Sequence, residues 1–384
     1  MTTSRDTGRD RGRDGGRDKE TLRRACDRFL SHDPPLNPRR TLAGLAEVLP
    51  EDAEADFYGK GAVIEDFEQR IAAMLGKPAA VFGPSGKMLQ NAALRVWADR
   101  KGCRTIALHP QSHIAAEEAE AAERVYGLQG TALGAPNRLA QPEDLEAIAE
   151  PLGAVALEIP LRRLGCRLHP WEDVEAFAAL ARARGLPLHA DAARIWESQP
   201  FYGRSPAEIA APFDSLYVSF YKGLGGLAGA ALAGPEDVVA EVRRWQQRSG
   251  GQMIHLFPYV AAAMKGLDER LPRMPAYHDK AKAIARALSA LPRVRVSPDP
   301  PQANALLVIL ETGGADLVDA ALDVAEASGL WLFNEPLVSP YDGLGVFEIT
   351  VREGAMALRE EEIVEGVLAL QRALADRRAG GRVA

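Results

Sequence analysis

The chain has 384 residues, 47% hydrophobic and 26% charged, which predicts a globular protein of two or three domains. Its formal charge of −7 argues against a general electrostatic hold on nucleic acid or on an anionic membrane surface. No apolar run approaches the ~20 residues of a membrane span, and the N-terminus has no signal-peptide core, so we expect a cytoplasmic protein.

Residues 1–20 repeat Arg-Asp pairs between glycines and, after Met1, carry no large apolar side chain. Such a segment cannot bury enough apolar surface to offset the entropy lost on ordering, so residues 1–20 are predicted to be a disordered tail. We expect residues 21–260 to form an N-terminal segment and a large domain. Residues 261–384 are expected to form an interdomain helix and a small domain.

Short apolar runs alternate with longer segments of mixed polarity from residue 63 onward. This alternation is typical of an α/β fold whose largely parallel sheet is covered by helices on both faces. The predicted strands are 79–82, 105–108, 154–160, 187–191, 215–221 and 228–234, and the predicted helices are 63–75, 88–98, 171–184 and 235–248.

A long helical stretch, residues 258–291, separates this region from a second strand–helix series. The series consists of strands at 305–310 and 346–351 and helices at 316–328 and 359–374. It predicts a smaller α+β domain at the C-terminal end.

Three sequence signatures of ligand or metal binding are incomplete in this chain. The run from Gly223 to Ala228 fits G-x-G-x-x-A but leads into a small, apolar, strand-like segment, whereas a dinucleotide fingerprint must open a helix. Gly86-Lys87 lacks the earlier glycine and the following Ser/Thr of a P-loop. Three scattered cysteines and seven histidines without an HExxH pair give no reason to expect a metal site.

Two charged side chains follow predicted strands, where ligands of open α/β sheets normally bind. Asp191 ends the run 187–191, and its carboxylate could face a cationic ring nitrogen or simply cap the next turn. Lys222 ends the run 215–222 before a glycine-rich stretch. A lysine there could act as a Schiff-base nucleophile, because burial lowers the pKa of an amine, or could extend to solvent.

Two further segments could complete a ligand site. Ser85, Gly86 and Lys87 enter a predicted helix, so backbone N–H groups, a hydroxyl and a positive charge could hold a phosphate; the alternative is a simple helix cap by Ser85. His113 follows a predicted strand, where its ring could lie against a ligand ring or be an ordinary loop histidine. A phosphate, a protonated pyridine and an aldehyde together describe pyridoxal 5'-phosphate.

The order of these elements, and several short motifs, resemble the threonine aldolase/β-eliminating lyase family of fold-type I pyridoxal-phosphate enzymes. His189-Ala-Asp191-Ala-Ala-Arg194 resembles the family's H-x-D-G-A-R, and Ser219-Phe-Tyr-Lys222-Gly-Leu-Gly resembles its S-K-G-L-G. The resemblance covers about residues 30 to 370. Further matching segments are Asp56-Phe-Tyr58-Gly59, Phe82-Gly-Pro-Ser85-Gly86, and Arg243-Arg-Trp with Gly250-Gly251.

The resemblance implies a role for each matched residue. It implies that Lys222 holds the cofactor, Asp191 pairs with the pyridinium, His113 stacks on the ring and Arg194 binds the substrate carboxylate. The cofactor-binding set would then be Ser85, Gly86, Lys87, His113, Asp191, Ser219 and Lys222.

The resemblance also implies an activity and an assembly. The expected reaction is cleavage of a β-hydroxy-α-amino acid to glycine and an aldehyde, and the alternatives are a β-eliminating lyase or a cofactor-binding protein without robust catalysis. The expected partners are a small amino-acid substrate and further copies of the chain, in a homodimer or homotetramer.

The chain departs from the aldolase pattern in its C-terminal domain. Aldolases have R-L-V-T-H there, and its arginine makes a second carboxylate contact, whereas this chain has Phe347-Glu-Ile-Thr-Val. Arg162 or Arg352 could replace that arginine. We therefore expect weak activity on threonine and better activity on a bulkier substrate that uses space beside Phe347.

Overall fold

The structure is a computed structural model that describes residues 18–311, 316–337 and 343–380. Its backbone divides into two compact units. Among the described residues, unit 1 comprises 18–35, 286–296, 307–311, 316–337 and 343–380, and unit 2 comprises 36–285 and 297–306. Residues 18–35 thus lie in unit 1 and a later boundary lies near residue 285, whereas the sequence predicts boundaries near residues 20 and 260.

The predicted tail lies mostly outside the described residues, since residues 1–17 are not described. Its last two residues differ from the prediction, because helix α1 runs over Lys19–Ala25. Asp18 caps this helix by accepting the backbone N–H groups of Glu20 and Thr21 at 3.1 and 3.2 Å. Satisfying these otherwise unpaired groups starts the helix within the Arg-Asp repeat.

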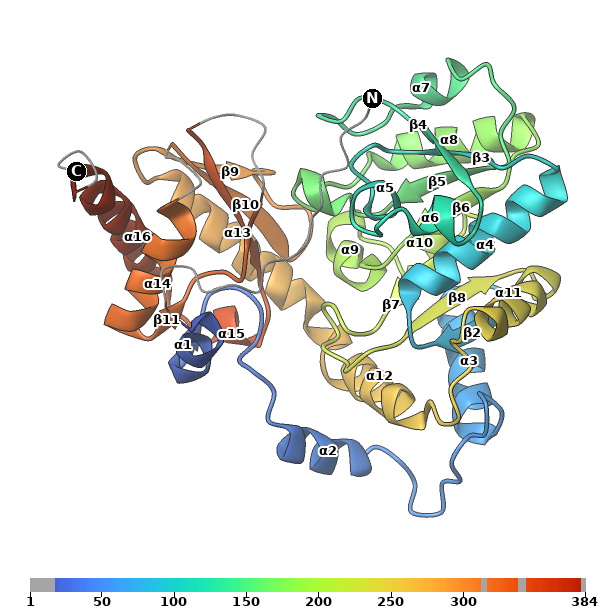
Figure 1. Ribbon diagram of the computed structural model, residues 1–384, viewed down its shortest axis with the longest axis horizontal. Coiled ribbons are helices and arrows are strands. Elements are labelled where there is room, and N and C mark those ends of the chain that lie inside the picture. The colour runs from blue at the N-terminus through green and yellow to red at the C-terminus, as the bar shows by residue number, and fades with distance from the viewer. Residues whose placement is uncertain (1–17, 312–315, 338–342, 381–384) are drawn as a thin grey trace. The chain divides into compact units, whose positions relative to one another are not determined.

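Unit 2 is built on a seven-stranded sheet in the order β2-β8-β7-β6-β5-β3-β4 (Figure 1). β8 runs antiparallel to β2 and β7, and the other neighbouring pairs are parallel. The bounds are β2 Ala79–Gly83, β3 Thr105–Leu108, β4 Gln129–Ala132, β5 Ala154–Glu158, β6 Leu188–Asp191, β7 Ser215–Ser219 and β8 Ala230–Gly234. All six predicted strands of this region are confirmed.

Two details of this sheet bear on the sequence predictions. The glycine-rich run after Lys222 leads into β8, so the rejection of a dinucleotide fingerprint there is confirmed. The edge strand β4 was not predicted, because its four residues, Gln-Gly-Thr-Ala, form no apolar run and lie partly or fully exposed.

Helices pack on the sheet and bring together segments far apart in sequence. α4 (Gly86–Lys101) lies against the sheet, and its apolar residues Leu89, Ala92 and Val96 are fully buried in a core shared with α11 (Glu236–Arg248) and the strands. The other helices of this unit are α2 Pro38–Ala46, α3 Ala62–Met74, α5 His113–Ala116, α6 Ala121–Arg124, α7 Pro142–Glu146, α8 Trp171–Ala183, α9 Ile195–Tyr202, α10 Pro206–Ala210, α12 Phe257–Glu269 and most of α13 Met274–Ser289, with 3₁₀ turns at Arg162–Leu164 and Leu271–Arg273.

The predicted helical stretch 258–291 is confirmed as α12 and α13, separated by the 3₁₀ turn Leu271–Arg273. Pro272 in that turn has no backbone N–H to continue the helical hydrogen-bond ladder. None of the helices in the described residues is long and apolar enough to cross a bilayer.

Unit 1 contains most of a second sheet, of order β12-β13-β10-β9, and a pair of short parallel strands, β1 and β11. The four strands are β9 Val294–Ser297, β10 Ala305–Leu310, β12 Pro336–Leu337 and β13 Gly345–Thr350; the pair is β1 Arg28–Phe29 and β11 Leu330–Trp331; the helices are α14 Leu317–Ser328, α15 Glu353–Met356 and α16 Glu360–Gly380. The strand–helix series predicted for the small domain is confirmed.

Candidate active site

The ends of three adjacent parallel strands form the candidate site in unit 2. β5 ends at Glu158 and β6 at Asp191, and these two residues are register partners on neighbouring strands. β7, which pairs with β6, ends at Ser219, and Lys222 follows three residues later. Because the carboxyl ends of parallel strands meet at one edge of the sheet, two carboxylates and an amine gather there.

Lys222 has an amine that loses its proton readily. Burial and the nearby charge of Arg194 lower its pKa to about 8, against the opposing attraction of Asp191 and Glu158. Its Nζ lies 6.0 Å from the ring centres of both Tyr217 and Tyr221. A lysine in this environment is partly neutral near neutral pH, which is the form that attacks an aldehyde.

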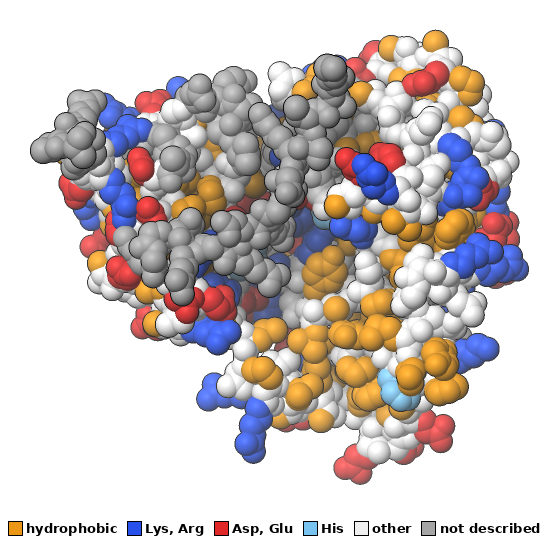
Figure 2. Space-filling view, viewed as in Figure 1, with side chains coloured by type: hydrophobic (Ala, Val, Ile, Leu, Met, Phe, Trp, Pro, Cys, Tyr) orange, Lys and Arg blue, Asp and Glu red, His pale blue; other side chains and the backbone are white. Residues whose placement is uncertain are grey.

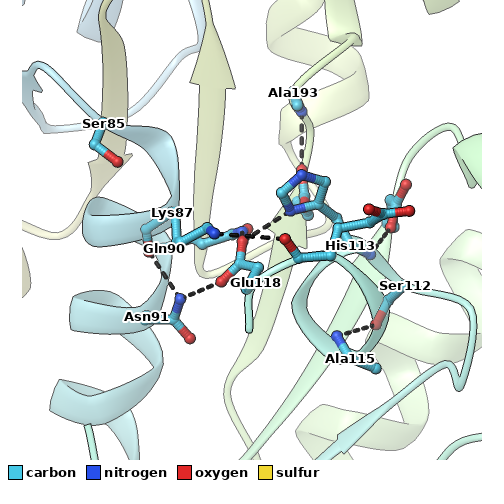
Figure 3. A network of polar contacts seen from close by, with 12 residues as sticks. Ser85, Lys87, Gln90, Asn91, Ser112, His113, Ala115, Glu118 and Ala193 are labelled. Atoms are coloured by element: carbon cyan, nitrogen blue, oxygen red, sulfur yellow. Dashed lines mark hydrogen bonds and ion pairs between the residues drawn. The ribbon is translucent and has the colours of Figure 1, made fainter. Parts of the chain in front are cut away.

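The two carboxyl groups have environments that hinder ionisation. Burial raises the pKa of Asp191, while the charges of Lys222 and His113 oppose that rise. Burial, followed by the charge of Asp191, raises the pKa of Glu158 to about 7. Asp191 Oδ1 accepts the backbone N–H of Ala193 at 3.2 Å, which holds the carboxylate against the turn after β6 (Figure 3).

Glu158 was not identified as a site residue from the sequence, although its position is central. Oε2 accepts the backbone N–H of His113 at 2.6 Å, and Oε1 accepts that of Arg162 at 3.0 Å. One side chain therefore ties the end of β5 to the start of α5 and to the 3₁₀ turn Arg162–Leu164. Arg162, a sequence-predicted substitute for the aldolase arginine, thus begins its turn at this edge of the sheet.

His113 is the first residue of α5, and Figure 3 shows its ring directed toward Glu118. The imidazole Nδ1 lies 2.8 Å from Oε1 of Glu118, whose side chain is fully buried. The helix start is capped by Ser112, whose hydroxyl accepts the backbone N–H of Ala115 at 3.4 Å. Glu118 was not predicted from the sequence, because a carboxylate in a short turn carries no periodic signal.

The start of α4 carries the residues that the sequence predicts to bind a phosphate. Ser85 caps the helix, its Oγ accepting the backbone N–H of Met88 at 3.4 Å, and Lys87 Nζ lies 3.4 Å from the carbonyl oxygen of Glu117. Gly86 is required here, since a Cβ at this position would lie 2.2 Å from ring atoms of Tyr217. Backbone N–H groups at the start of this 16-residue helix favour a bound anion.

Ser219 and Arg194 complete the predicted set. Ser219 Oγ donates to the carbonyl oxygen of Ala193 at 2.9 Å, so the end of β7 is joined to the turn that follows Asp191. Arg194 precedes α9, and its charge acts on Lys222. A second missed residue, Glu197 of α9, accepts the backbone N–H of Gly223 at 2.9 Å and so anchors the turn after Lys222.

The expectation of open space beside Phe347 is wrong. Phe347 is fully buried and stacks on Phe333, with ring centres 4.6 Å apart and ring planes 23° apart. Both residues belong to unit 1, where they fill its core. Arg352, in the same unit, lies 3.9 Å from the carboxylate of Asp33.

Known proteins share this fold and these sequence features. The pattern of the Beta-eliminating lyase family matches residues 45–312, more than half of the chain. The chain belongs to the threonine aldolase/β-eliminating lyase family. Its α/β architecture is that of the fold-type I pyridoxal-phosphate enzymes.

Individual relatives agree with this family. The low-specificity L-threonine aldolase 1 of Arabidopsis thaliana is 27% identical over 293 residues, covering 73% of this chain and 81% of the relative. A solved structure of a candidate L-allo-threonine aldolase from Listeria monocytogenes EGD-E is 35% identical, with a TM-score of 0.85, and the match covers 92% and 97% of the two chains. A candidate aromatic amino acid β-eliminating lyase/threonine aldolase from Exiguobacterium sp. 255-15 is 34% identical, with a TM-score of 0.86 and coverage of 92% and 99%.

Proposed function

We propose that the protein is a pyridoxal-phosphate-dependent lyase that cleaves a β-hydroxy-α-amino acid to glycine and an aldehyde. The observation that carries the proposal is the gathering of Asp191, Lys222 and His113 at one edge of the large sheet. The family supports it, since the chain is similar to low-specificity L-threonine aldolases along most of its length.

The residues present fit this cofactor. A buried carboxylate, Asp191, suits a protonated ring nitrogen, and an amine of lowered pKa, Lys222, suits an aldehyde. The start of α4, with Gly86 packed against Tyr217, suits a phosphate. Ser85, Lys87 and Ser219 complete the proposed cofactor-binding set.

Each group of the chain has a task in the proposed reaction. When bound, pyridoxal phosphate supplies an electron sink for the charge left on the substrate's α-carbon. Asp191 would keep the ring nitrogen protonated, and Arg194 would orient the substrate by its carboxylate through a planar, two-point contact. His113 would contact the cofactor ring.

Retro-aldol cleavage also requires a base, because the β-hydroxyl proton must leave as the Cα–Cβ bond breaks. Two groups at this edge can act as that base. The imidazole of His113 offers a ring nitrogen, and the carboxylate of Glu158 has its pKa raised to about 7. The site therefore holds the base that the reaction needs.

The second candidate function is β-elimination from a β-substituted amino acid, which is the activity named by the family pattern. A panel of amino acids, assayed separately for glycine plus aldehyde and for keto acid plus ammonia, distinguishes the two. Glycine plus aldehyde from a β-hydroxy substrate supports the first proposal. Keto acid and ammonia alone across the panel would replace it with the second.

We also propose that the protein assembles into at least a homodimer. Figure 2 shows hydrophobic side chains gathered over the part of unit 2 that carries α12, α11 and α3. The exposed large apolar residues of unit 2 include an aromatic–aliphatic cluster of Phe57, Tyr58, Met253 and Ile254, and the backbone N–H of Tyr58 donates to the carbonyl oxygen of Ile254 at 2.9 Å. An apolar cluster of this kind on a globular protein suits a second copy of the chain. A cytoplasmic location stays a prediction.

A further inference from the structure

Glu118 is an ionisable residue outside the proposed cofactor-binding set. Its side chain is fully buried and accepts hydrogen bonds from Gln90 Nε2 at 2.6 Å and Asn91 Nδ2 at 2.5 Å, and its Oε1 lies 2.8 Å from His113 Nδ1 (Figure 3). Gln90 and Asn91 are consecutive residues of α4, so this helix provides two donors to a carboxylate that follows α5.

The two amides are oriented for a negative charge. Their N–H groups point to Glu118, while Gln90 Oε1 and Asn91 Oδ1 are buried and have no hydrogen-bond partner among the described residues. The opposite amide orientation would place carbonyl oxygens against the carboxylate. Both amides therefore donate to Glu118 and leave their own oxygens without a described partner. A carboxylate surrounded by donors in this way is in the environment of its ionised form.

An ionised carboxylate has no proton to donate, so the hydrogen atom in the His113–Glu118 contact belongs to Nδ1 of the imidazole. The neutral ring then has its lone pair on Nε2. Glu158 fixes the same residue from another strand, since its Oε2 accepts the backbone N–H of His113 at 2.6 Å. His113 is thus held at the ring by Glu118 and at the backbone by Glu158.

We propose that Glu118 is a positioning residue that fixes His113 in the Nδ1–H tautomer and makes Nε2 the atom that accepts a hydrogen bond or a proton from the substrate. The role of Nε2 rests on the proposed function, whereas the tautomer does not. The charge of His113 acts on the buried carboxyl group of Asp191, so this histidine lies near one of the groups proposed to bind the ligand.

The tautomer can be measured directly by ¹⁵N NMR of the histidine side chains in the cofactor-loaded, full-length protein. The His113 signals are identified by their absence in a His113→Asn variant. In the neutral ring of the wild type we expect a protonated Nδ1 and an unprotonated Nε2. The reverse assignment in the wild type would overturn the proposal without any variant of Glu118.

Two substitutions of Glu118 distinguish the effect of its acceptor oxygen from the effect of its negative charge. Glu118→Leu removes the acceptor, so the Nδ1–H preference should be lost and kcat should fall by about 10- to 100-fold, the range seen when the carboxylate that orients a metal-binding histidine is removed. Glu118→Gln keeps an acceptor oxygen, so the tautomer should be retained and the loss in kcat should be smaller. An unchanged His113 tautomer in Glu118→Leu would contradict the proposal.

Glu68 offers a matched control for the loss of a buried carboxylate. It is also buried in unit 2 and accepts the backbone N–H of Phe82 at 2.7 Å and a hydrogen bond from Arg243, without contacting His113. Glu68→Leu should leave the His113 tautomer unchanged.

The experiments also distinguish failure of this proposal from failure of the proposed function. If the wild type shows no lyase activity on any amino acid, the proposed function fails, while the NMR result still decides the role of Glu118.

Discussion

At the scale of single residues, the charges at the sheet edge depend on one another. Burial and Arg194 disfavour the cationic form of Lys222, whereas burial disfavours the anionic forms of Asp191 and Glu158. A bound cation at the ring nitrogen would favour ionised Asp191, and a covalent bond to the amine would use its neutral form. These environments fit the proposed ligand, which carries a cationic ring nitrogen and an aldehyde.

The lowered pKa of Lys222 predicts the pH dependence of cofactor attachment. Only the neutral amine attacks an aldehyde, so the rate at which cofactor-free protein bonds pyridoxal phosphate should rise with pH and level off above about 8, well below the 10.5 of an ordinary lysine. The measurement is the absorbance change on mixing at a series of pH values. Borohydride trapping and peptide mapping should place the label on Lys222, and Lys222→Ala should lose it. A label on Lys87 would contradict the assignment.

Asp191→Asn should retain the cofactor but lose most turnover, because a neutral amide cannot stabilise a protonated ring nitrogen. We expect a loss of at least about 100-fold in rate, which corresponds to about 2.7 kcal/mol of lost transition-state stabilisation. Steady-state kinetics and bound-cofactor content measure the two effects. Asp214→Asn is the control, since Asp214 accepts the backbone N–H of Leu188 at the opposite end of β6. Near-normal turnover in Asp191→Asn would remove this residue from the catalytic set.

At the scale of elements, the helices α4 and α5 each contribute residues to the candidate site. The start of α4 forms the proposed phosphate site, and its next turn provides the two amides that hold Glu118. The first residue of α5 is His113, whose backbone is fixed by the end of β5. A change that moves the start of α4 should therefore disturb both ligand binding and the histidine.

Gly86→Ala tests this dependence. The added Cβ would lie 2.2 Å from the Tyr217 ring, so α4 or the buried ring must shift, at a cost of about 1–3 kcal/mol in the free energy of unfolding. Cofactor affinity should fall along with thermal stability. Gly44→Ala in α2 is the control, because its Cβ would have no atom closer than 3.7 Å and alanine favours a helix. Unaltered cofactor affinity in Gly86→Ala would separate the start of α4 from the phosphate.

At the scale of the whole molecule, the exposed apolar cluster of unit 2 bears on assembly. The motif around Asp56 explains how an apolar cluster is presented on unit 2. Asp56 is buried and accepts the backbone N–H groups of Leu256 and Phe257, both at 2.8 Å, while Phe57 beside it is 64% exposed. The buried carboxylate thus fixes two neighbouring segments whose apolar side chains face outward.

The double variant Phe57→Lys with Ile254→Lys should weaken the proposed dimer, because it places two positive charges in an apolar contact. We expect the dissociation constant to rise by at least about 10-fold, since removing such contacts costs upwards of 1.4 kcal/mol. Sedimentation velocity over a range of concentrations measures it. Val125→Lys, which changes a similarly exposed residue, should leave assembly unchanged. A monomeric wild type would rule out the dimer.

The strand–helix order, and the places of Asp191 and Lys222 at the ends of buried runs, can be predicted from the amino-acid sequence. Apolar periodicity reports burial along a strand, and a charged residue at the end of a buried run is visible without knowing its neighbours. The contacts among the other residues of the candidate site depend on the tertiary structure. Gln90 and Glu118 are 28 positions apart and meet because α4 and the turn after α5 pack together, and Glu158 reaches His113 because β5 and β3 are adjacent. The burial of Phe347 was decided in the same way, since its stacking on Phe333 depends on the packing of two separate segments.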